Sequence, residues 1–209
     1  MKSNRLLYVL WITLLPFGAA AQGYRGPEGG ISSHFGVKAG PSLTRLNVSG
    51  VTPATPKSKF DPHLGVMYRL RLHRFVFQPE LLYARKGGRL EVPRQGAVNP
   101  DTRDPITNRY HYVSVPVLLG WIPTEGLTLQ AGPEFSYALQ TGGRTDPGAR
   151  RDLGLVVGAH YDFLDMLEKF SLHVRYVYGL NNVSGSDIFT YRNRAVQVAI
   201  VYNLYPKQK

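Results

Sequence analysis

The sequence predicts an all-β protein: an eight-stranded antiparallel up-and-down transmembrane β-barrel, preceded by a cleavable signal peptide. Three observations lead to this fold class. Apolar and polar residues alternate with period two over eight segments of the 209-residue chain, as in strands with one apolar face. After residue 21, no stretch contains the roughly 18 consecutive apolar residues that a transmembrane helix needs. The connections between the segments are alternately short and long, as in transmembrane barrels.

The start of the chain has the layout of a secretory signal. Lys2 and Arg5 precede an apolar run over residues 6–17, and three alanines follow at 19–21. The run is too short to span a bilayer comfortably, so we expect cleavage after the alanines rather than a retained anchor. The predicted division is a signal peptide at 1–21, a flexible Gly-rich leader at 22–33 and an outer-membrane β-barrel domain at 34–205.

The first four strand segments each place apolar residues on one face. Each is about long enough to cross the hydrocarbon region when tilted, which takes on the order of ten residues. Their apolar residues are Phe35, Val37, Ala39 and Leu43 in 34–45; Leu64, Val66, Tyr68 and Leu70 in 61–71; Phe75, Phe77, Leu81 and Tyr83 in 74–88; and Val113, Val115, Val117, Leu119 and Trp121 in 110–121.

The last four segments repeat the pattern, with aromatic residues toward several strand ends. These segments are 126–140 with Leu127, Leu129, Phe135, Tyr137 and Leu139; 151–162 with Leu153, Leu155, Val157 and Tyr161; 170–180 with Phe170, Leu172, Val174, Tyr176, Tyr178 and Leu180; and 191–204 with Val196, Val198, Ile200, Tyr202 and Leu204.

The connections predict the topology. Short ones lie near residue 72, at "IPTEG" and at "FLDMLEK", whereas those at 46–60, 89–109, 141–150 and 182–190 are longer and rich in turn-forming and charged residues. Short periplasmic turns, long outer loops and an even strand number are typical of outer-membrane barrels.

Prolines inside the predicted strands conflict with a closed barrel, because each removes a hydrogen bond between neighbouring strands, so we expect bulges or strand ends at these positions. The prolines are Pro41, Pro79, Pro116 and Pro133.

Long polar residues and glycines occupy the face opposite the apolar one. A narrow eight-stranded barrel has a lumen just wide enough for side chains to fill, so small residues must make room for long ones. We therefore expect Arg175 to point inward and Tyr176 to face lipid. Buried charges need partners, so Glu80 and Glu134 are expected to pair with Lys38, Arg69 and Arg175. The predicted structural polar network of the lumen is Lys38, Arg69, Glu80, Glu134, His160, His173 and Arg175.

Five stretches resemble a known family. "FGVKAGPSLTRL", "FQPELLYARKGG", "YHYVSVPVLLGW", "LQAGPEFSYAL" and "AVQVAIVYNL" are similar to the PorT-type outer-membrane β-barrel proteins of Bacteroidetes-like bacteria. The most specific pieces are "QPELLY" at 78–83 and "YVSVPVLL" at 112–119, and the likeness covers essentially the whole chain after the signal peptide. The resemblance implies an eight-stranded barrel in the outer membrane, with a role in secretion or maturation of surface proteins.

The residues offer two kinds of candidate chemical site. His160 and His173 point inward on neighbouring predicted strands, so that with Glu134 or Asp162 they are a candidate metal site. Lumen histidines whose hydrogen bonds are satisfied by neighbouring side chains are commoner than metal ligands, and the chain has no cysteine, so we predict no metal and no cofactor.

Phosphate-binding loops and nucleophile elbows are absent from the sequence. We predict no enzyme; the alternative is a lipid-acting outer-membrane enzyme using outer-rim residues, whose candidates are His111, Ser114 and Asp104.

Charge suggests a ligand for the loops. The chain has 25 basic and 14 acidic residues, and arginines gather around two of the long connections. Arginine clusters at the outer rim can bind lipopolysaccharide phosphates, the alternative being a solvated basic loop. Nucleic acid makes little sense as the partner of an exported chain. The predicted lipopolysaccharide contacts are Arg94, Arg103, Arg109, Arg144 and Arg150.

The sequence therefore predicts an integral outer-membrane protein with a filled lumen and basic extracellular loops, exported by its signal peptide. It is expected to be a structural or interaction component of the cell envelope. Its expected partners are the outer-membrane bilayer, lipopolysaccharide phosphates, the outer-membrane assembly machinery and an envelope protein. A soluble secreted barrel that binds an apolar ligand is a further alternative, which requires the Phe, Val and Leu face to line the inside.

Overall fold

The computed structural model describes residues 30–50, 55–94, 103–141, 150–163, 167, 169–183 and 189–205. The predicted signal peptide and residues 22–29 of the predicted leader lie outside these ranges. No helix in the described part of the chain is long and apolar enough to cross a membrane. The strands formed by the described residues are β1 (Ile31–Gly50), β2 (Thr55–Lys57), β3 (Lys59–Leu72), β4 (Phe75–Pro93), β5 (Arg103–Thr124), β6 (Leu127–Thr141), β7 (Arg151–Asp162), β8 (Phe170–Gly179) and β9 (Phe189–Leu204).

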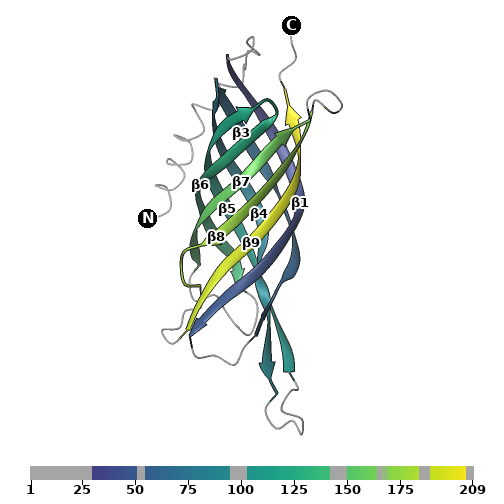
Figure 1. Ribbon diagram of the computed structural model, residues 1–209. Helices are drawn as coiled ribbons and strands as arrows, with labels where there is room; N and C mark the ends of the chain where they lie inside the picture. The colour runs from purple at the N-terminus through teal and green to yellow at the C-terminus, as the bar shows by residue number, and fades with distance from the viewer. Residues whose placement is uncertain are drawn as a thin grey trace, which may run out of the picture.

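The eight long strands form one closed antiparallel barrel (Figure 1). Each long strand pairs with its neighbours in the chain, β1 pairs with both β3 and β9, and the β4–β5 pairing belongs to the same continuous circuit. The short β2 lies outside this circuit and pairs only with β4. The predicted fold class, an all-β eight-stranded up-and-down barrel, is confirmed.

Several strands are longer than predicted. β4 continues to Pro93 and β5 begins at Arg103, so much of the predicted loop at 89–109 is a two-stranded ribbon that extends past the other strands (Figure 1). The two strands stay in register from Gly87 opposite Arg109 to Pro93 opposite Arg103. Their backbone groups therefore bond to each other in a two-stranded ladder. β1 likewise begins at Ile31, inside the predicted leader.

The short connections lie at one end of the barrel. His73, with a φ of 55°, and Arg74 form the turn between β3 and β4, and Gly126, with a φ of 79°, completes the turn between β5 and β6. Ile31 at the start of β1 pairs with Leu72 beside the first turn, and β9 also ends at this end of the barrel (Figure 1). The longer connections lie at the opposite end, as predicted from their lengths.

The four prolines lie inside strands without bulges, so the expectation of bulges or strand ends was wrong. Each keeps its pairing on one side, as Pro41 does with Pro62 of β3 and Pro133 does with Leu155 of β7. On the other side the ladder is interrupted without a change of register, for example between Ala39 and Ser42 where β1 meets β9. The missing N–H is therefore accommodated by a local gap in one ladder.

Exposure alternates along the barrel wall. Val156 is 0% exposed and its neighbour Val157 is 46% exposed. Large apolar side chains point outward on every barrel strand, whereas most inward side chains are polar or small. Arg175 is buried inside and Tyr176 lies on the outer face. This arrangement contradicts the alternative of a soluble barrel with an apolar interior.

Candidate functional site

The candidate site is the filled lumen. All seven residues predicted for the lumen network are at most 3% exposed. They come from β1, β3, β4, β6, β7 and β8, where the period of two directs them to the inside. The structure therefore gathers them in one interior, although not with all the partners expected from the sequence.

A chain of five charges crosses the centre of the lumen. Glu80 Oε2 lies 2.5 Å from Lys38 Nζ and 2.8 Å from Arg175 Nη1. Glu134 Oε2 lies 3.8 Å from Arg175 Nη2, and Glu134 Oε1 lies 2.7 Å from Lys86 Nζ. These five residues, which we call the ion ladder, alternate in sign and come from four strands that are not all neighbours. They tie separate parts of the wall together through the interior.

Polar neighbours complete the bonding of the ion ladder. Gln78 donates to Glu80 Oε1 over 2.8 Å, and Arg175 donates to Gln197 over 2.6 Å. Lys86 also donates to Ser136 over 2.8 Å. Buried ion pairs offset their desolvation cost only when such additional hydrogen bonds are made. The interior is therefore a bonded polar core.

Lys86 is a member of the ion ladder that the sequence analysis missed. It lies six residues after Glu80 on β4 and so points to the same side of the strand. Its position near the expected end of the strand hid it, although extending the alternation from Glu80 by three more steps of two would have found it.

Arg69 belongs to a second cluster, nearer the short turns. It donates to Thr128 over 2.6 Å and lies 3.5 Å from Asp162 Oδ2. The expected pairing of Arg69 with Glu80 or Glu134 was therefore wrong. Both glutamates are already engaged by the ion ladder, and Arg69 lies instead beside Asp162 of β7, which also accepts a hydrogen bond from Ser171.

The two inward histidines are close together, with ring centroids 5.4 Å apart. His160 contacts Asp162 over 3.1 Å, while Lys38 Nζ lies 3.3 Å from His173 Nδ1. An ammonium group thus lies on the Nδ1 side of the His173 ring. Within the described ranges, no group of three or more His, Asp or Glu side chains is arranged to hold a metal.

The candidate residues for lipid chemistry do not meet. Ser114 is buried in the lumen, where it bonds to Ser136 over 2.7 Å. His111 bonds to Tyr83 over 2.5 Å, and Asp104 bonds to Arg94 over 2.6 Å. Along an extended strand, Asp104 and His111 are roughly 23 Å apart. The three side chains therefore form no catalytic arrangement.

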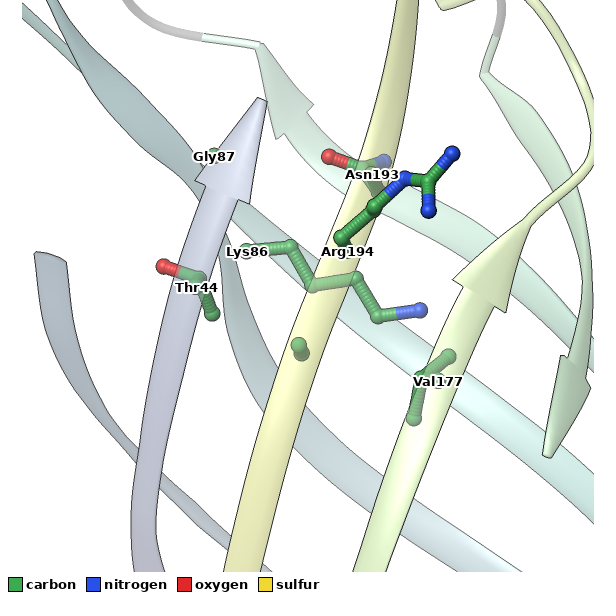
Figure 2. A pocket seen from close by; sticks show the side chains of 7 residues that line it. Thr44, Lys86, Gly87, Val177, Asn193 and Arg194 are labelled. Atoms are coloured by element: carbon green, nitrogen blue, oxygen red, sulfur yellow. The ribbon is translucent and has the colours of Figure 1, made fainter. Parts of the chain in front are cut away.

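A small pocket lies in the wall beside Lys86 (Figure 2). Thr44 of β1, Val177 of β8, and Asn193 and Arg194 of β9 surround it together with Lys86 and Gly87 of β4. Its volume is about 10 Å³, which is roughly the space for one water molecule. It does not provide room for a larger ligand.

A family model described as outer membrane protein beta-barrel domain matches residues 20–185. The chain belongs to this family. It is thus an outer-membrane β-barrel protein, embedded in the lipid bilayer of the bacterial outer membrane. Among curated proteins, no sequence matches it.

The barrel was also compared with solved structures. It is similar to Neisserial surface protein A, with a TM-score of 0.49 and 12% sequence identity over 84% of this chain and 99% of the other. It is similar to the attachment invasion locus protein Ail of Yersinia pestis, with a TM-score of 0.43 and 14% identity over 83% of this chain and 99% of the other.

Family membership orients the outer-membrane barrel. Barrels of this kind have short periplasmic turns and longer extracellular loops, so the end with the two tight turns faces the periplasm. The exposed Phe, Val, Leu and Ile residues of the outer face are then the lipid-contacting belt.

The five loop arginines predicted to bind phosphate are only partly described. Arg94 is exposed and donates three hydrogen bonds to Asp104, whose carboxyl pKa is held below its usual value by this bonding. Arg150 is exposed. Arg103 and Arg109 lie on the extended part of β5, but their side chains, like the whole of Arg144, fall outside the described residues. The structure therefore brings none of these arginines together in the described part of the chain.

Proposed function

We propose that this outer-membrane barrel is a non-conducting structural or interaction component of the cell envelope, with no catalytic role. The observation that carries the proposal is the ion ladder, which fills the lumen with bonded side chains at the level of Glu80 and Arg175. A channel needs a water-filled path through the lumen. The ion pairs of the ion ladder leave no such path at the level where they cross the lumen.

The ribbon of β4 and β5 supports an interaction role. It extends the barrel beyond the membrane-spanning part on the extracellular side, and among the described residues β2 pairs with its β4 edge at 89–91 and leaves 92 and 93 without a β2 partner. A paired but exposed ribbon can present side chains and a free strand edge to an envelope partner. The PorT-type resemblance adds secretion or maturation of surface proteins as the process in which such a partner would act.

Contacts with lipopolysaccharide phosphates through Arg94, Arg103, Arg109, Arg144 and Arg150 belong to the same proposal. Their support is the excess of basic over acidic residues and the exposure of Arg94 and Arg150. Insertion by the outer-membrane assembly machinery after export through the signal peptide is likewise part of the proposal.

The test is conductance across a planar bilayer. The refolded full chain is added to a bilayer, and insertion is verified by the mobility shift of folded barrels on unheated gels. We expect no reproducible current steps, because the ion ladder blocks the lumen. A pore-forming peptide added at the end serves as the positive control. Steady steps of one size from the folded protein would contradict the proposal.

A further inference from the structure

An arginine group lies on the outer face where the lipid-contacting belt ends. On β9 the outward residues Ile200, Val198 and Val196 are followed, at the same spacing of two, by Arg194 and Arg192. On β1 the outward apolar residues end in the same way, with Arg45 after Leu43. Leu43 pairs with Val196 and Arg45 pairs with Arg194, so both strands change from apolar to cationic at one level.

The pairing places like charges directly opposite each other. Side chains at paired positions have Cβ atoms about 4.5–5.5 Å apart, and like charges there are destabilising. Arg192 lies two residues further along β9, opposite Asn47 and diagonal to Arg45, at about 7–8 Å. The three arginines therefore occupy neighbouring positions on one patch of the barrel surface.

No carboxylate in the described part of the chain forms an ion pair with any of the three. At the same end of the barrel, Lys57, Lys59 and Arg94 each pair with an acidic side chain. Among the described residues, the three arginines thus have no acidic partner, whereas these other cations of the same end each have one.

Arg194 is held in place by aromatic residues. Its guanidinium carbon lies 4.1 Å from the centre of the Tyr178 ring, and it donates to the Tyr176 hydroxyl over 3.2 Å. Tyrosines of this kind mark the membrane interface, where their rings lie at the level of the headgroups. The group therefore sits at headgroup height on the extracellular side, with Arg45 and Arg192 exposed.

We propose that Arg45, Arg192 and Arg194 form a binding site for the phosphate groups of a phosphorylated glycolipid in the outer leaflet. Guanidinium groups bind phosphate oxygens through paired charge-assisted hydrogen bonds. A phosphate between Arg45 and Arg194 removes their repulsion, and the apolar belt below receives the acyl chains. The site rests on the membrane placement of the barrel and is separate from the loop arginines of the proposed function.

The test compares two matched double variants of the full chain. R45Q/R192Q removes two exposed arginines of the group, and R89Q/R151Q removes two exposed arginines near the long connections that lie outside the five loop arginines of the proposed function. Each folded protein is titrated in detergent with diphosphoryl lipid A, and bound lipid is counted by native mass spectrometry. Phosphatidylcholine is the lipid control, and inorganic phosphate is added as a competitor.

We expect R45Q/R192Q to bind lipid A about tenfold more weakly or worse, since a charge-assisted hydrogen bond contributes enough to change affinity by that factor. R89Q/R151Q should bind like the original chain. Unchanged binding by R45Q/R192Q, or a loss confined to R89Q/R151Q, would overturn the inference, and the latter result would favour the arginines near the long connections. Competition by inorganic phosphate at the concentration of the lipid would instead indicate a site for the free anion.

A single variant covers the case in which the double variant does not fold. R192Q leaves β1 unchanged and removes the arginine that is not directly opposite another. It should weaken lipid A binding by a smaller factor, again with no change for phosphatidylcholine. Full retention of lipid A binding by folded R192Q would contradict a three-arginine site.

Discussion

Glu80 is the residue on which the interior of the barrel depends most. Its carboxylate is the only one in the described ranges that lies within 3 Å of two buried cationic groups, those of Lys38 and Arg175. Breaking a buried pair by removing one partner is costly, because the remaining charge stays in a medium of low dielectric constant without compensation. Here the removal of one carboxylate would leave Lys38 without a carboxylate partner and Arg175 with Glu134 at 3.8 Å.

Substitution of Glu80 by Gln is therefore expected to lower the free energy of unfolding by about 3–5 kcal/mol. The measurement is urea unfolding of the refolded protein in lipid vesicles, followed by tryptophan fluorescence. The matched control is Glu125→Gln, because Glu125 is an exposed carboxylate in the turn after β5. Equal midpoints for the two variants would show that the ion ladder contributes little to stability.

At the scale of the element, the β4–β5 ribbon has two parts with different surroundings. From Tyr110 onward, β5 pairs with both β4 and β6, whereas over 103–109 it pairs, among the described strands, only with β4. The ladder of the ribbon is thus independent of the barrel wall. The barrel needs the part of β5 from Tyr110 onward for closure, whereas 103–109 bonds to no described barrel strand other than β4.

The outer part of the ribbon should accordingly be removable. We expect a chain in which residues 91–105 are replaced by Asn-Gly to fold as before, because Leu90 and Ile106 are paired and this dipeptide closes a two-residue hairpin. The mobility of unheated and heated samples on a gel measures folding. Replacement of residues 130–134 within β6, which lie in the wall, is the control that should abolish it. Loss of folding on ribbon removal would show that the ribbon assists barrel formation.

At the scale of the whole molecule, the barrel reverses the usual distribution of polarity. Its interior is polar and charged, and its outer face is apolar, because lipid takes the place of water around it. Two adjacent valines show this reversal. The Val156 side chain is buried on the lumen side of the wall, and the Val157 side chain is 46% exposed on the lipid side.

Single cysteines at these two positions, in a chain without other cysteines, test the reversal. Val157→Cys should react with a membrane-permeant maleimide, and a fluorophore attached there should be quenched by a lipid-embedded quencher. Val156→Cys should stay unmodified until the protein is unfolded in urea. Reaction of Val156→Cys in the folded state would mean that the lumen is open to small molecules.

Much of this protein follows from the sequence by itself. The alternation with a period of two predicted where each strand segment lies and which of its residues share a face, since successive side chains of a strand point to opposite sides. The same rule put Lys38, Glu80, Glu134 and Arg175 on one face, and the need of a buried charge for a partner predicted that they would pair. Alternate connection lengths predicted the up-and-down order of the strands.

Only the tertiary structure decided which charges meet. Arg69 binds Thr128 and Asp162 rather than a glutamate, because the register and tilt of the closed barrel set the height of each side chain in the lumen. The ribbon, the in-register prolines and the opposition of Arg45 to Arg194 also depend on which residues of two distant strands are paired. Period-two alternation determines the face of a residue, but its partner across the ladder is determined by the register, which arises only when the barrel closes.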